Sequence, residues 1–197
     1  MNDNRYSRQL MLEQIGEEGQ RRLLASRVAV IGVGGLGSAV ATYLAGAGVG
    51  SIVLADPDTV SLSNLQRQIL YSECEIGLPK AECALRRLRA LNSDIEIIAC
   101  NESLTASNAK NLLQGCNLLI DCTDNYAARY LIDDICAEFS IPWIYGSIGE
   151  FHGQLTLFGG ATRRRYAELY PDRDTLCALP HRTKGVLGAV PGVIGAM

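Results

Sequence analysis

The chain has 197 residues, a formal net charge of −3 and 48 % hydrophobic residues, which is an ordinary globular composition. This charge gives no electrostatic footprint for nucleic acid, and no apolar run approaches the about 20 residues that span a bilayer. The amino terminus does not open a secretory signal, so we expect a cytoplasmic protein that forms a single domain over residues 1–197.

Strands and helices alternate along the first three quarters of the chain. Residues 5–24 are amphipathic and are interrupted near Gly16 and Gly19, which predicts two short helices. Strands are predicted at residues 28–32, 51–56, 94–100, 116–122 and 141–145, and helices at 38–46, 79–91, 107–113 and 125–139. This alternation indicates an α/β fold with a doubly wound, mostly parallel sheet.

The pattern changes after Gly146. Residues 154–158 alternate like an antiparallel strand, and a basic run and a loop follow over residues 163–184. Residues 185–197 are small and apolar and carry no helix stop signal, so we expect the natural chain to continue.

The seven cysteines are odd in number, scattered, and never arranged as C-x-x-C. A disulfide framework or a zinc site would cluster them. Most fall in predicted strands or helices, where cysteine acts as a small apolar residue. Cys177 is the exception, because it falls in the predicted polar loop.

A glycine-rich loop follows the first predicted strand. Gly32, Gly34, Gly35 and Gly37 allow a sharp turn and a close approach of backbone N–H groups to a phosphate at a helix N-terminus. The alternative is a purely structural turn, which does not need four glycines. The loop therefore predicts a nucleotide-binding site.

An acid at the end of the second predicted strand is typical of dinucleotide-binding folds, where it holds the ribose hydroxyls. Asp56 occupies that position. On this evidence alone NAD is the favoured ligand. The alternative for Asp56 is a structural role, as a helix cap or a loop acid.

Three further segments favour a nucleoside triphosphate instead. They are residues 62–69, residues 77–80 and residues 121–125. They bring Arg67, Lys80 and Asp124 to the carboxyl ends of the strands, where cations would neutralise phosphates and a carboxylate would hold Mg²⁺. The P-loop pattern G-x-x-x-x-G-K-[ST] is absent.

The ordered set of motifs resembles the ThiF/MoeB/HesA family, the bacterial relatives of ubiquitin-activating E1 enzymes. The matching segments are residues 5–9, 32–37, 64–68, Lys80, 123–125, 153–154 and 185–188. The resemblance implies ATP-dependent adenylation of the carboxyl-terminal glycine of a ubiquitin-like sulfur carrier such as ThiS or MoaD, with release of pyrophosphate. Thiamine or molybdopterin-type sulfur transfer would follow.

The resemblance also implies a role for each matching residue. The four glycines would line the nucleotide, and Asp56 would bind the ribose. Asn64, Arg67 and Lys80 would contact the triphosphate. Asp124, followed by Asn125, would hold Mg²⁺, and Arg8 would reach across a homodimer interface to the partner's ATP. Gln68 matches without an assigned role, and Asp121 is expected to be a buried structural carboxylate.

The domain division follows from the same resemblance. Residues 1–26 would form amino-terminal helices, residues 27–150 the nucleotide-binding core, and residues 151–197 a carrier-binding part. A segment beyond Met197 would complete the groove for the carrier's tail. The attacking carboxylate is already ionised at neutral pH, so the reaction needs cations to screen charge and no general base.

The chain departs from the family at its zinc site. Two C-x-x-C pairs bind structural zinc in most relatives, but Arg165 and Glu168 stand at the first pair's positions. We therefore predict no zinc, and we expect these two side chains to form an i,i+3 ion pair.

A second departure concerns the thiol that some relatives place before residues 185–188. His181 or Arg182 stands there, and the nearest thiol is Cys177. Cys177 is a candidate thiolate acceptor of the adenylate, and an exposed cysteine without chemistry is the alternative. His181 is interpreted as a solvated histidine.

Three other functions stay open at this point. One is ATP activation of another carboxylate, amide or RNA-linked substrate on the same scaffold. Another is a binding protein that keeps the fold without activity. The last is an NAD-dependent oxidoreductase, which would need a hydride-site acid or base that the motifs do not supply.

Overall fold

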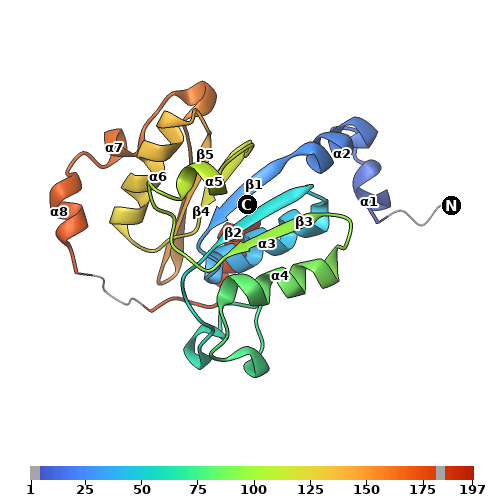
Figure 1. Ribbon diagram of the computed structural model, residues 1–197, viewed down its shortest axis with the longest axis horizontal. Coiled ribbons are helices and arrows are strands. Elements are labelled where there is room, and N and C mark those ends of the chain that lie inside the picture. The colour runs from blue at the N-terminus through green and yellow to red at the C-terminus, as the bar shows by residue number, and fades with distance from the viewer. Residues whose placement is uncertain (1–4, 181–184) are drawn as a thin grey trace.

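The computed structural model describes residues 5–180 and 185–197. Within these residues a six-stranded sheet has the order β3-β2-β1-β4-β5-β6 (Figure 1). Its strands are β1 (Arg27–Ile31), β2 (Ser51–Ala55), β3 (Glu96–Cys100), β4 (Leu118–Asp121), β5 (Trp143–Gly149) and β6 (His152–Phe158). The first five are parallel and β6 is antiparallel to β5, which confirms the predicted fold class.

Short helices surround this sheet. They are α1 (Ser7–Leu10), α2 (Gly16–Ala25), α3 (Gly35–Ala47), α4 (Lys80–Leu91), α5 (Ala109–Leu112), α6 (Tyr126–Glu138), α7 (Tyr166–Leu169), α8 (Arg173–Ala178) and α9 (Ala189–Ala196). Three 3₁₀ turns cover Leu62–Asn64, Glu73–Glu75 and Gly160–Thr162. No helix in the described part of the chain combines the length and apolar character needed to cross a membrane.

Both faces of the sheet carry an apolar core, as the uninterrupted apolar strands require. Val28 and Val30 of β1 pack with α3 and α4, whereas Ala29 and Ile31 pack with α5, α6 and α7. Burial of each such Val, Leu or Ile side chain contributes about 1.5–3 kcal/mol. Because β1, β4 and β5 pair in parallel, the carboxyl ends of these strands lie at one common edge of the sheet.

Several predicted boundaries were wrong. Helix α3 begins at Gly35 rather than at residue 38, so two of the loop glycines are helical. Helix α2 begins at Gly16, whose φ of +52° suits glycine, and it continues through Gly19. The break predicted near those glycines lies before them.

The predicted loop over residues 163–184 was also wrong in part. This stretch contains α7 and α8, and Cys177 lies exposed on α8 rather than in a loop. These helices are too short to show a periodic apolar pattern, and contacts with α6 hold them in place.

Candidate functional site

The glycine loop turns the chain from β1 into α3. Gly32 has φ +86°, and a Cβ there would lie 2.8 Å from the carbonyl oxygen of Cys122. A Cβ on Gly37 would lie 2.0 Å from the carbonyl oxygen of Gly32. Only glycine fits these two positions, and the turn is packed directly against the chain that follows β4.

The N-terminus of α3 lacks a side-chain cap within the described residues. Gly34 is the N-cap residue, and among these residues no side-chain cap hydrogen bond is formed. The first-turn N–H groups have no partner within the helix and carry the positive end of its dipole. The loop is therefore suited to an anion such as a phosphate.

Asp56 ties this loop to the end of β2. Its carboxylate accepts the N–H of Val33 at 2.6 Å and the N–H of Asp58 at 2.9 Å. Burial raises the pKa of Asp56, while these two backbone hydrogen bonds and the Lys80 charge oppose that shift. The carboxylate keeps lone pairs beyond these two bonds, which is what a ribose hydroxyl would need.

Arg67 and Asn64 lie on the segment that passes beside the loop. The Arg67 Cγ is 3.5 Å from the place that a Cβ on Gly35 would occupy, and its Nη1 donates to the Ser63 carbonyl oxygen at 3.0 Å. The Asn64 Oδ1 accepts the Ser61 N–H at 3.3 Å, which closes a 3₁₀ turn. Both side chains thus make a local structural contact, and their contact with a triphosphate stays a prediction.

Gln68 is the buried polar side chain of this segment. Its Nε2 lies 3.5 Å from the place that a Cβ on Gly34 would occupy. Its Oε1 is buried and has no hydrogen-bond partner within the described residues. A buried oxygen without a partner costs about 1–3 kcal/mol, so this atom fits a site that a polar ligand completes.

Lys80 begins α4 and is almost completely buried, with a side chain 6 % exposed. Its Nζ lies 2.8 Å from Oδ2 of Asp58. Asp58 is a residue that the sequence interpretation missed, although an acid two positions after Asp56 was a usable signal. The pair holds the Lys80 ammonium on the side of Asp56.

Asp121 ends β4 and is fully buried, as expected. Its Oδ1 accepts the N–H of Thr123 at 2.8 Å and the hydroxyl of Thr123 at 2.7 Å. Its Oδ2 lies 3.7 Å from Nε of Arg129. Burial raises the pKa of Asp121 to about 6, although the Arg129 charge and the Thr123 bonds oppose this.

Asp124 and Asn125 follow at the start of α6, and both are exposed. The Asn125 side chain accepts the N–H of Ala128 at 2.9 Å and so caps α6. No group of three or more metal-type side chains occurs among the described residues. The role of Asp124 as a Mg²⁺ ligand stays a prediction, and one exposed carboxylate is compatible with it because this ion is commonly held by one carboxylate together with phosphate oxygens and water.

Arg8 lies apart from these residues. The α1 segment is held at the other end of α3, where Tyr6 packs against Gly48 and Arg5 donates to the Leu91 carbonyl oxygen. The 13 residues of α3 separate the two ends by about 20 Å. Within one chain, Arg8 therefore does not reach the glycine loop, and His181 and Arg182 lie outside the described residues.

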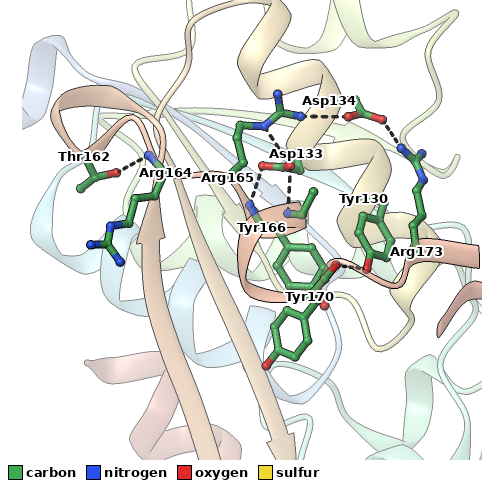
Figure 2. Close-up of polar contacts among 10 residues, drawn as sticks. Tyr130, Asp133, Asp134, Thr162, Arg164, Arg165, Tyr166, Tyr170 and Arg173 are labelled. Carbon is green, nitrogen blue, oxygen red and sulfur yellow. Dashed lines mark hydrogen bonds and ion pairs between the residues drawn. The ribbon is translucent and has the colours of Figure 1, made fainter. Parts of the chain in front are cut away.

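The predicted ion pair between Arg165 and Glu168 was wrong. Arg165 instead contacts α6, with Nε 2.9 Å from Asp133 and Nη2 2.9 Å from Asp134 (Figure 2). The reason is that Arg165 precedes α7 in an extended conformation and does not share a helix face with Glu168. The absence of zinc stays a prediction.

Comparisons with known proteins show the family of the chain. The ThiF family matches residues 6–197. The sulfur carrier protein ThiS adenylyltransferase of Escherichia coli is 44 % identical over 204 residues, which cover 100 % of this chain and 80 % of that protein. The SAMP-activating enzyme E1 of Haloferax volcanii is 40 % identical and covers 98 % of this chain and 72 % of its own length.

Solved structures share the fold and are longer. E. coli MccB with ATP matches with a TM-score of 0.82 at 25 % identity, over 99 % of this chain and 61 % of MccB. E. coli tRNA N6-threonylcarbamoyladenosine dehydratase in complex with ATP matches with a TM-score of 0.65 at 30 % identity, over 69 % of this chain and 57 % of that chain. The chain therefore spans less than two thirds of each of these solved chains.

Proposed function

Because the chain belongs to the ThiF family, we propose that it is an ATP-dependent adenylyltransferase that activates the carboxyl-terminal glycine of a ubiquitin-like sulfur carrier. One observation carries this proposal. The uncapped α3 N-terminus, Arg67, and the turn after Asp121 are gathered at one edge of the sheet, and the buried Lys80 lies beside Asp56 at the end of β2. This set of groups can screen the repulsion between the carrier's terminal carboxylate and the triphosphate of ATP.

The proposal gives each of these residues the role that the family resemblance implies. The α3 N-terminus binds phosphate oxygens, and Asp56 holds the ribose. Arg67 and Lys80 neutralise the triphosphate, and the buried Lys80 acts in a medium where charge is poorly screened. Asp124 would hold Mg²⁺, which would supply positive charge to screen the phosphates.

The carrier's terminal carboxylate attacks the α-phosphorus of ATP. A P–O bond forms to the carboxylate oxygen as the bond to the pyrophosphate oxygen breaks, which leaves an acyl-adenylate. The attacking group is ionised at neutral pH, so no side chain of this chain has to remove a proton. The residues named above therefore act by binding, orienting and screening.

The same proposal includes a homodimer. Arg8 lies about the length of α3 away from the glycine loop of its own chain, so it serves a nucleotide only if it belongs to a second copy. A cytoplasmic sulfur-carrier pathway, such as thiamine or molybdopterin synthesis, is the proposed setting. Cys177, exposed on α8, stays a candidate thiol acceptor.

The test is ATP–pyrophosphate exchange with purified ThiS that ends in Gly-Gly. Exchange that depends on ThiS and is lost when the two glycines are removed supports the proposal. ATP binding without exchange, for ThiS and for a MoaD-type carrier alike, would indicate an inactive scaffold. Preferential binding of NAD would indicate an oxidoreductase.

A further inference from the structure

The hairpin of β5 and β6 extends beyond the parallel part of the sheet. β4 ends at Asp121, which is paired with Tyr145, whereas β5 continues to Gly149. The residues after Tyr145 and their partners on β6 therefore project past the edge where the glycine loop and Asp124 lie. Gln154, opposite Ser147, is in this projecting part and is exposed.

Two tyrosines fix the orientation of the Gln154 amide. Its Oε1 accepts the hydroxyl of Tyr145 at 3.2 Å and the hydroxyl of Tyr170 at 3.2 Å. With both donors on the oxygen, the Nε2 group faces away from them. No hydrogen-bond partner for Nε2 occurs within the described part of the chain, so two N–H groups remain for a ligand.

Tyr170 is itself held firmly by α6 and α7 (Figure 2). The Tyr130 hydroxyl donates to the Tyr170 carbonyl oxygen, and the Tyr170 ring stacks near Tyr166 with centroids 4.8 Å apart. The N–H of Tyr166 in turn donates to the buried Asp133 at 3.0 Å. A side chain that is oriented before binding loses less entropy when it binds.

Tyr145 connects this amide to the proposed active site. Its ring lies under the Arg129 guanidinium, 5.1 Å from the centroid. The Nη2 of Arg129 donates to the carbonyl oxygen of Thr123, directly before Asp124. Gln154 is thus linked through Tyr145 and Arg129 to the turn that carries Asp124.

We propose that Gln154 determines specificity for the extended carboxyl-terminal tail of the protein substrate, by donating from Nε2 to a main-chain carbonyl of that tail. This inference rests on the proposed function. The terminal glycines of such a tail have no side chains, so contacts to that part use its backbone groups. An amide that is oriented by two phenols supplies such a donor at a fixed position.

The experiment measures exchange at varied ThiS and varied ATP with Gln154→Leu, which removes the amide and leaves an apolar side chain that ends at Cδ. The matched control is Gln114→Leu, because Gln114 is exposed and lies near the amino ends of the strands. We expect the KM for ThiS to rise about threefold to tenfold in Gln154→Leu, with the KM for ATP unchanged. Tyr170→Phe, which removes one of the two orienting donors, should give a smaller rise.

Three outcomes are decisive. A rise in the ThiS KM alone, absent from Gln114→Leu, supports the assignment. An unchanged ThiS KM, or an equal rise in the KM values for ThiS and ATP, overturns it while the proposed function stands. Absence of exchange in the unmodified protein with ThiS and with a MoaD-type carrier alike would instead refute the proposed function, and with it the need for a tail contact.

Discussion

The glycine loop between β1 and α3 and the segment of residues 159–178, which contains α7 and α8, are held in place by different interactions. The loop is set by its backbone, since Gly32 and Gly37 leave no room for a Cβ, and by the apolar β1 beneath it. This second segment is held to α6 both by aromatic packing, with Tyr166 buried against Tyr130, and by polar contacts to Asp133 (Figure 2). The first region depends on close backbone packing, which includes the distant Cys122 carbonyl beside Gly32. The second depends on side-chain contacts between residues about 30 positions apart.

The acids of these two regions differ in burial, and burial decides what each can do. Asp133 is 1 % exposed and accepts from Arg165 and from the backbone of α7, so its hydrogen bonds are strong and structural. Asp134 pairs with Arg165 and Arg173 at about half exposure, where such pairs contribute about 0–1 kcal/mol. Asp124, in contrast to Asp133, is exposed at the edge of the sheet, where a ligand can reach it.

The largest expected effect separates activity from stability. Asp124→Ala should lower ThiS-dependent exchange by about 10²–10³-fold, because it removes the proposed metal ligand. Its free energy of unfolding should stay near that of the unmodified protein, since the side chain is exposed. The control is Asp174→Ala on α8, and near-normal exchange in Asp124→Ala would remove this residue from its metal role.

The next largest effect is on stability rather than on activity. Asp133→Ala should lower the free energy of unfolding in urea by about 2–3 kcal/mol, because Arg165 and the α7 N–H groups lose their buried acceptor. Asp134→Ala, which removes an exposed acceptor of two arginines, should cost less than about 1 kcal/mol. Equal losses in the two variants would show that burial does not distinguish them.

A smaller effect is expected for ATP binding. Arg67→Ala should weaken the affinity for ATP about tenfold or more in a calorimetric titration, because one charge-assisted phosphate contact is lost. Arg87→Ala on the exposed side of α4 serves as the control. An affinity equal to that of the control would count against the phosphate contact.

The smallest effect concerns Asp121. Its folded pKa of about 6 lies above the ordinary value of 3.8, so the folded chain binds this proton more tightly than the unfolded chain. Raising the pH from 5 to 7 should therefore lower the free energy of unfolding by about 1 kcal/mol through this group. Asp121→Asn leaves Arg129 without its acid and is expected to be less stable. The free energy of unfolding of this variant should lack the pH-dependent contribution of Asp121. Identical slopes of unfolding free energy against pH for the two proteins would contradict the assignment.

The parallel strands could be predicted as short, mostly apolar runs, and β6 could be predicted from its alternating pattern. Asp56, Lys80 and Asp121 were also recognisable, since residues that end strands or begin helices meet at the carboxyl edge of a parallel sheet. The Asp58–Lys80 pair, the capping by Asn125 and the unpartnered Gln68 oxygen were not predicted. Each depends on an orientation of side chains that spacing alone does not contain.

The residue order by itself determined the α/β fold, the glycine turn and the identity of the charged residues near it, because periodicity, glycine and strand ends act within a few residues. Only the tertiary structure decided that Arg165 pairs with Asp133 rather than with Glu168, and that Tyr145 and Tyr170 share Gln154. It alone placed Arg8 at the far end of α3. These outcomes depend on which surfaces pack together, and packing is set by the whole chain at once.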